Sequence, residues 1–329
     1  MATPLLSRLG MFAAKAEATS GTWTAPANTE ATFRVLNLKY TPDIKVAERN
    51  TLRVDLSRNA HLIGQTLAKL EFDLEFKVSA VAGTADAYGI LLKACGLKED
   101  PLTGPARVRY NPSTLLSDHK TLSIYAWIGG SGPAGSGMRV GMRGCMGSVR
   151  FSGKVGEPLM MHFEFMGVGD RDETDMKPQY ASFLTGITYE TGVPPIFQAA
   201  TFSWDSLSVN LTNDFTLDFG TQVTAREDIT AQEGVAHYMV TGRGVTGSFS
   251  PELHLTGGSN HLEQLNLGSE VAISCVLTHA TARTLTIAIP KAQLTNVQSG
   301  DRNGIATWAC TFAANASSAG DDEVTLTIN

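Results

Sequence analysis

The sequence carries one pattern of residues twice. When Phe72 is aligned with Phe249, an offset of 177 residues, the alternating apolar residues around both positions coincide. Further along the chain the offset falls to 147, and Phe163 aligns with Cys310. Internal repetition constrains a fold strongly, because each copy has to form the same structural unit. The sequence therefore predicts two tandem copies of one unit.

Each copy is predicted to be mainly antiparallel β-structure. From residue 69 to residue 78, apolar side chains such as Phe72 and Phe76 alternate strictly with charged ones. This period of two indicates strands with one face on a core and the other on water or a charged surface. Residues 159–165, 306–312 and 324–329 alternate in the same way, and Asn303-Gly304 predicts a hairpin turn.

One short helix per copy is predicted within this β-structure. Residues 85–95 place Tyr88, Leu91 and Leu92 on one stripe, and Gly96 follows as a C-cap. Residues 261–265 are a weaker counterpart in the second copy. The first copy is longer because of residues 98–119 and a glycine-rich tract at 129–137, which is predicted to be a flexible hairpin tip.

The predicted division of the chain has three parts. Residues 1–175 form the first unit, including the N-terminal arm and the glycine-rich tip. Residues 176–195 form a linker, and residues 196–329 form the second unit. A charge run at 170–173 and the pair Pro194-Pro195 mark the connection between the copies.

The charge is distributed unevenly along the chain. Of 26 Lys and Arg, 5 lie in residues 181–329, against 14 of 32 Asp and Glu, so this half carries −9 and the rest +3. An acidic half disfavours sequence-specific binding of nucleic acid. It remains compatible with a pore through which DNA passes without adhering.

No arrangement typical of catalysis, cofactor binding or metal binding is found. The four cysteines are far apart and are predicted to be buried thiols. Two G-x-G-x-x-G matches, beginning at Gly130 and Gly242, are not followed by a helix, as a dinucleotide site requires. The carboxylate cluster at 170–175 lacks the pattern of a calcium loop. We expect no enzyme activity, no cofactor and no metal.

No membrane insertion is expected either. The apolar residues at the start of the chain are interrupted by Arg8 and Lys15, so no hydrophobic region of a signal peptide is present. No apolar run approaches the length of a transmembrane helix. Folding in a cytoplasm is the expectation.

Several segments resemble the major tail tube proteins of long-tailed, non-contractile bacteriophages and prophages (siphophages). The resemblance lies in residues 39–49, 70–78 and 83–97, in the opening stretch 14–22 and in the final strand at 320–326. It covers almost the whole chain and rests on strand patterns, without a catalytic signature.

This resemblance implies a structural virion protein with a β-sandwich or partly closed barrel flanked by a helix. Proteins of that family form rings whose inner strands line a channel for DNA ejection. Because this chain carries two units, three copies are expected to complete a pseudo-hexameric ring. The implied partners are other copies of the chain, a tape-measure protein, tail terminator and tip proteins, and DNA in transit. The implied location is the virion tail, assembled in the bacterial host cytoplasm.

The resemblance also implies two sets of functional residues. The loops at 41–68 and 218–246 correspond to the loop that reaches the adjacent ring, with a solvated loop as the alternative. The residues expected there are Arg49, Arg53, Asp55, Arg58, Arg226, Glu227 and Asp228. Carboxylates expected to line the lumen, or else the outer surface, are Glu71, Asp73, Glu75 and Glu164.

Two alternative functions remain open from the sequence. A baseplate or other tail ring component would form one ring without polymerising. A tandem β-sandwich that binds glycans, or an adhesin module, would normally show clustered exposed aromatic residues, whereas the four Trp residues are widely spread.

Overall fold

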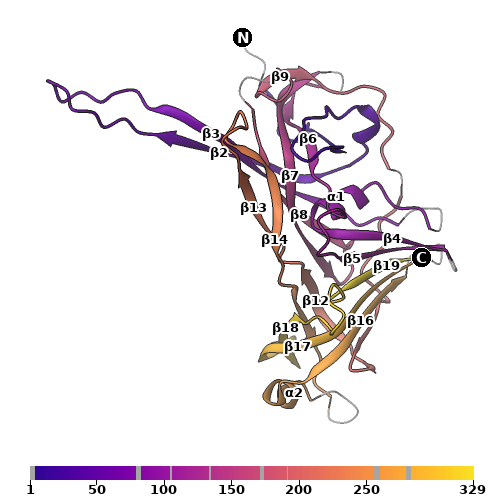
Figure 1. The fold of residues 1–329 in the computed structure, drawn as a ribbon. Helices are drawn as coiled ribbons and strands as arrows, with labels where there is room; N and C mark the ends of the chain where they lie inside the picture. The colour runs from indigo at the N-terminus through magenta and orange to yellow at the C-terminus, as the bar shows by residue number, and fades with distance from the viewer. Residues whose placement is uncertain are drawn as a thin grey trace.

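The computed structural model describes residues 4–78, 83–103, 106–132, 135–170, 174–190, 192–254, 260–278 and 283–329. It is mainly β-structure, with two short α-helices among these residues (Figure 1). The fold class predicted from the alternating pattern is confirmed. Residues 171–173 of the charge run and residues 133–134 of the glycine-rich tract lie outside the described ranges.

One antiparallel sheet of eight strands runs continuously through both copies. Its neighbours are paired in a single order from one edge to the other. The order is β2 (Leu36–Ala47), β3 (Leu62–Glu75), β8 (Met160–Val168), the second half of β7 (Ser136–Lys154), β12 (Leu211–Asp218), β15 (Thr246–Pro251), β18 (Ile305–Ala314) and the second half of β17 (Thr284–Arg302).

The pairing in this sheet follows the two offsets of the sequence repeat. Phe72 on β3 lies opposite Phe163 on β8, and Phe249 on β15 lies opposite Cys310 on β18. These are the residues that the offsets of 177 and 147 equate. Strands β2, β3, β8 and β7 therefore correspond to β12, β15, β18 and β17.

The long strands β7 and β17 continue into a second layer. The first half of β7 pairs with β6 (Leu122–Gly130), which also pairs with β1 (Met11–Ala16). The first half of β17 pairs with β16 (Glu270–Thr278), which also pairs with β10 (Thr201–Trp204). In β7 the register shifts between Arg143 and Met146, where Gly144 has a φ of 59°. Such a left-handed residue favours glycine and marks the bend between the layers.

Short strands complete this layer. β9 (Gln179–Ser182) pairs with β7, and β11 (Leu207–Ser208) pairs with β10. β9 lies within the segment 176–195, which the sequence assigns to a linker. The division of the chain at residues 175 and 196 remains a proposal.

The second layer also joins the two copies. The C-terminal strand β19 (Thr325–Ile328) pairs with β17 on one side and with β5 (Ala106–Pro112) on the other. β5 forms a hairpin with β4 (Leu97–Thr103). The additional residues of the first copy thus extend a sheet of the second copy (Figure 1).

One continuous apolar cluster lies beneath the eight-stranded sheet and extends across both copies. The rings of Phe72, Phe163 and Phe165 stack in the first copy, and Trp204 packs on Phe249 in the second. All five side chains are fully buried. Burying one large apolar side chain contributes about 1.5–3 kcal/mol, so this continuous core holds the copies together.

The two predicted helices are present. α1 (Gly89–Ala94) begins four residues later than predicted, because residues up to Tyr88 form a turn in which the Asp86 carbonyl accepts from the Gly89 amide. α2 (His261–Leu267) begins after Asn260, whose side chain accepts from the Glu263 amide, and ends at Gly268 with a φ of 63°. A 3-10 turn, η1, covers Asn28–Glu30.

Candidate assembly interface

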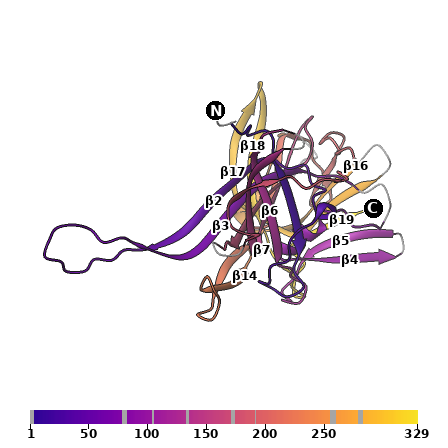
Figure 2. The ribbon, with the colours of Figure 1, turned by 90° about the horizontal axis from the view of Figure 1, so that it is seen from above.

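The most prominent feature of the molecule is a long hairpin that projects from the body (Figures 1 and 2). It consists of the outer parts of β2 and β3, which pair as far as Ala47 and Leu62. Residues 48–61 form its tip, and we call residues 41–68 the arm. The side chains of Ile44, Val46 and Ile63 are exposed along it.

Three apolar residues at the tip are fully exposed. Leu52, Val54 and Leu56 occupy alternate positions and make no contact that removes them from solvent. An exposed apolar group of this kind is typical of a surface that another molecule covers. Burying each side chain would contribute about 1.5–3 kcal/mol.

Four charged residues of the predicted stacking set share this tip. Arg53 lies 3.3 Å from Asp55 and donates to Asn59 Oδ1 at 2.9 Å. Arg49 and Arg58 are exposed. The tip thus presents apolar and charged side chains together, at the farthest point from the core.

The other three residues of that set lie on a different hairpin. β13 (Gln222–Glu227) and β14 (Val235–Gly242) form a two-stranded sheet that corresponds by sequence to the outer part of the arm. Arg226 and Glu227 are exposed on β13, and Asp228 lies in the turn. Hydrogen bonds from Thr230 lower the pKa of the Asp228 carboxyl.

This second hairpin lies against the first copy near the base of the arm (Figure 1). A separate apolar cluster joins them, and the Arg143 guanidinium donates to the carbonyl oxygen of Ala236 at 3.2 Å. The buried Glu233 carboxylate accepts from the backbone amide of Thr66 on β3 at 3.1 Å. The cluster consists of Leu67, Met146, Val168, Val235 and Tyr238.

Two glycines explain why the hairpins take different courses. Between β12 and β13, Gly220 has a φ of 54°, and its carbonyl accepts from the Gly244 amide at 3.2 Å. A Cβ atom on Gly220 would lie 2.3 Å from the carbonyl oxygen of Gly244. The strands are interrupted there and the hairpin is separate from the sheet, whereas β2 and β3 continue without interruption into the arm.

The four predicted lumen carboxylates lie together on the polar face of the eight-stranded sheet. Glu71, Asp73 and Glu75 alternate with buried residues on β3, and Glu164 lies opposite Glu71 on β8. This face is opposite the apolar core, as the alternation requires.

Two lysines outside the predicted set accompany these carboxylates. The Lys69 ammonium lies 2.6 Å from Glu164 and 2.8 Å from Glu71, and Lys39 lies 3.2 Å from Glu71. The hydrogen bond from Lys69, followed by that from Lys39, lowers the pKa of Glu71. Lys69 alternates in phase with the carboxylates of β3, and this signal was available in the sequence, whereas Lys39 reaches Glu71 through the pairing of β2 with β3.

The second copy contributes mainly hydroxyl groups to the same face. The Thr216 and Ser248 hydroxyls lie 2.7 Å apart, and those of Thr295 and Thr311 lie 3.0 Å apart. On the polar face of the second copy these hydroxyls accompany the carboxylates of Asp214 and Asp218, which alternate with the buried Phe215 and Leu217 on β12.

The two halves of the sheet meet at a seam between β7 and β12. Asp218 lies opposite Arg150, Leu217 opposite Phe151, and Asp214 opposite Lys154. Leu217 and Phe151 are fully buried. Opposite charges and paired apolar residues across neighbouring strands stabilise such a junction.

At its two outer edges the sheet has no further pairing strand among the described residues. Among the described strands, β2 pairs only with β3, and residues 296–302 of β17 pair only with β18. Unpaired edges present rows of free backbone N–H and C=O groups that can pair with another chain.

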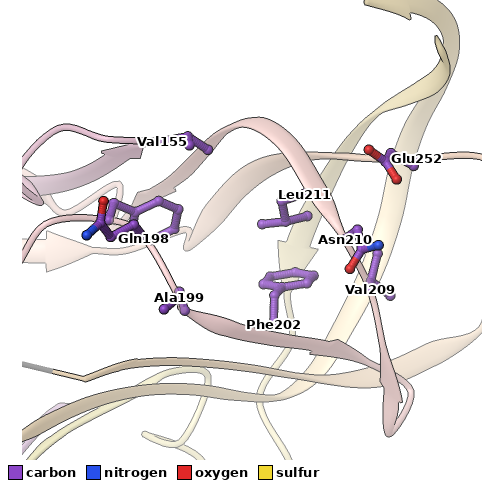
Figure 3. Close-up of a pocket in the computed structure, with 10 residues that line it drawn as sticks. Val155, Gln198, Ala199, Phe202, Val209, Asn210, Leu211 and Glu252 are labelled. Atoms are coloured by element: carbon purple, nitrogen blue, oxygen red, sulfur yellow. The ribbon is translucent and has the colours of Figure 1, made fainter.

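A pocket of about 350 Å³ opens beside the seam at the end of β7 (Figure 3). Among its lining residues, Figure 3 shows Leu211 near the Phe202 ring and Glu252 farther from them. Of the ten residues that line it, seven are apolar and Glu252 is ionisable.

No group of three His, Cys, Asp or Glu residues suited to a metal ion occurs in the described parts of the chain. The four cysteines are buried, and burial raises the pKa of the Cys275 and Cys310 thiols to about 12. The G-x-G-x-x-G stretch at 242–247 begins at the end of β14 and ends in β15, and the stretch that begins at Gly130, the last residue of β6, includes residues 133–134 outside the described ranges. Within the described residues, no helix is long and apolar enough to cross a membrane.

A family model described as phage tail tube protein matches residues 8–329, which is nearly the whole chain. No curated protein matches the sequence.

Proposed function

The chain belongs to the phage tail tube protein family, and we propose that it is the major tail tube subunit of a siphophage-type tail. In this proposal it polymerises as stacked rings around a channel through which DNA is ejected. The observation that carries the proposal is the continuous eight-stranded sheet, which has an unpaired edge at each end and one polar face.

Ring closure follows from the two edges. A sheet that closes on itself through further copies leaves no unpaired edge. Because each chain holds two equivalent four-stranded halves, three chains give a pseudo-hexameric barrel of about 24 strands. With strands about 4.8 Å apart and tilted by about 40°, the barrel would be roughly 50 Å across, wide enough for a DNA duplex.

The polar face of the sheet is the proposed lining of the channel. Glu71, Asp73, Glu75 and Glu164 would face the DNA, with Lys39 and Lys69 beside them. Carboxylates repel phosphate groups, while the paired lysines leave no large unpaired basic patch for DNA to bind. This lining suits DNA in transit without sequence-specific binding.

The arm is the proposed contact between successive rings. It projects well beyond the body and carries the exposed Leu52, Val54 and Leu56 at its tip. Contact with the next ring would bury these side chains and the charged groups beside them. Arg226, Glu227 and Asp228 lie on the docked hairpin, where they would face the same ring interface.

The remaining partners follow from this role. A tape-measure protein would occupy the lumen during assembly in the host cytoplasm, and terminator and tip proteins would bind the tube ends. The role is structural, and it requires neither catalysis nor a cofactor.

Electron microscopy of the purified protein in negative stain, at rising concentration, tests the proposal. Hollow tubes or stacked rings with three-fold symmetry are the expected result. Rings with six chains would overturn the trimer. Isolated rings that never stack would indicate a tail-end component, and monomers under every condition would favour a glycan-binding module.

A further inference from the structure

The seam inside the chain is a template for a contact between chains. At this seam, β12 of the second copy pairs with β7 of the first, with Asp218 opposite Arg150 and Leu217 opposite Phe151. If β2 is equivalent to β12 and β17 to β7, then β2 of one chain can pair with β17 of another in a defined register.

The equivalence of β17 and β7 can be fixed to the residue. Phe151 lies opposite Met161, and Ser299 lies opposite Trp308. The sequence offset of 147 equates Met161 with Trp308. Ser299 therefore occupies the position of Phe151, and Gln298 that of Arg150.

The equivalence of β2 and β12 follows in the same way. Tyr40 lies opposite Leu70, and Leu217 lies opposite Gly247. The offset of 177 equates Leu70 with Gly247. Tyr40 therefore occupies the position of Leu217, and Thr41 that of Asp218.

From these equivalences, and resting on the proposed function, we propose that β2 of one chain pairs antiparallel with residues 296–302 of β17 in the next chain. Thr41 lies opposite Gln298, Tyr40 opposite Ser299, and Lys39 opposite Gly300. The partner is a second copy of this chain.

The side chains at these positions suit the pairing. Tyr40 is only partly buried and Ser299 is exposed, so a large ring would lie against a small residue. Lys39 and Thr41 are exposed, and they would lie opposite Gly300 and the exposed Gln298, so no like charges directly face one another.

The seam also identifies the best position for a cross-link. Phe219 N–H donates to the carbonyl oxygen of Val149 at 3.1 Å, so Phe219 and Val149 form a hydrogen-bonded pair. The two kinds of pair alternate along an antiparallel ladder, so the next pair, Asp218 and Arg150, is a non-hydrogen-bonded pair. In non-hydrogen-bonded pairs the Cα atoms are about 4.5 Å apart. A disulfide accepts Cα distances of about 4.4–6.8 Å. Thr41 and Gln298 occupy the positions of Asp218 and Arg150, so they would form a non-hydrogen-bonded pair.

Disulfide trapping in assembled tubes tests the register. The variant carries Thr41→Cys and Gln298→Cys, both at exposed positions, and tubes are first grown under reducing conditions. The matched control carries Thr41→Cys and Asn296→Cys, two residues out of register. Lys39→Cys with Gly300→Cys provides a second in-register pair if the first variant does not assemble. The native cysteines are buried and do not compete.

The expected result after oxidation is a ladder of covalent dimers and trimers on a non-reducing gel from the in-register pairs, and at least tenfold less from the control. Tubes that form normally but cross-link more efficiently through Asn296, or through none of the pairs, would overturn the register and leave the tube function intact. A chain that forms no polymer, wild type included, would overturn both.

Discussion

The backbone amide of Thr66 donates a hydrogen bond to the buried carboxylate of Glu233 at 3.1 Å, across 167 residues of sequence. Thr66 lies at the base of the arm, and Glu233 lies near the end of the docked hairpin of the second copy. The Thr66 carbonyl also accepts from the Gly169 amide at 2.9 Å. The second copy therefore fixes the point from which the arm of the first copy projects.

Removal of this contact should loosen the base of the arm. Glu233→Ala leaves the partly buried Thr66 amide without this partner, which costs about 1–3 kcal/mol. We expect faster hydrogen exchange at Thr66, measured by mass spectrometry of the peptides around it. Glu227→Ala, at an exposed position of the same hairpin, is the control and should leave exchange unchanged. Equal exchange in both variants would contradict the bracing role.

A second buried carboxylate should be essential for folding of the first copy. Glu17 is almost fully buried and accepts from Gly21 N at 2.6 Å, Thr121 Oγ1 at 2.7 Å, and Ser123 Oγ and Gly144 N at 2.8 Å. Glu17→Ala leaves four donors unsatisfied and should lower the free energy of unfolding by about 3 kcal/mol or more.

Urea unfolding followed by tryptophan fluorescence measures this change. Glu157→Ala is the control, because Glu157 forms only an exposed pair with Lys154 at 3.1 Å. Exposed pairs contribute about 0–1 kcal/mol. Similar midpoints for the two variants would show that the Glu17 network is not needed.

Charge reversal on the two hairpins should weaken ring stacking without unfolding the subunit. Arg49 and Arg226 are exposed, so Arg49→Glu with Arg226→Glu should leave the thermal midpoint within about 2 °C of wild type. Sedimentation and electron microscopy should show a lower yield of long tubes. Normal tubes from the double variant would rule out a stacking role for these two residues.

Substitution of the apolar residues at the tip should impair assembly of the tube without lowering the stability of the monomer. Leu52→Ser, Val54→Ser and Leu56→Ser together change fully exposed residues, so the stability of the monomer should not fall. If the tip is buried between rings, loss of about 1.5–3 kcal/mol per residue should raise the critical concentration for tube formation more than tenfold. Leu115→Ser with Leu116→Ser, exposed residues away from the arm, is the matched control. An unchanged critical concentration would mean that the tip is not an interface.

Acid should weaken the contact between the C-terminal loop and the first copy. Burial alone would raise the pKa of Asp321, but hydrogen bonds from Thr114 and Arg243 outweigh it and hold that pKa below its usual value. A lowered pKa in the folded state contributes stability that is present above about pH 4 and is lost as the pH falls further.

Asp321→Asn removes this contribution, so the difference in unfolding free energy from wild type should be large at pH 6 and should shrink towards pH 2.5. Urea unfolding across this range measures it. Asp301→Asn, near the exposed end of β17, is the control. A difference that stays constant with pH would contradict the assignment to the Asp321 carboxylate.

The sequence alone determined the elements of the fold and their repetition. Alternation around Phe72 and Phe163 indicated which face of each strand is buried, because the period of a strand places successive side chains on opposite faces. The same pattern indicated the turn at Asn303-Gly304, where both residues have positive φ. It also placed Glu71 and Glu164 on polar faces, but not opposite one another, since pairing depends on which strands become neighbours.

Only the tertiary structure decided how the two copies are joined and where their edges remain free. The seam of Leu217 against Phe151 and the bond from Thr66 to Glu233 connect residues far apart in sequence. The two equivalent hairpins are placed differently. One is separated from the sheet at Gly220 and packs on the first copy, and the other continues from the sheet as the arm. Periodicity reports the environment of each residue along its own strand, whereas these contacts depend on which buried surfaces and unpaired edges meet in three dimensions.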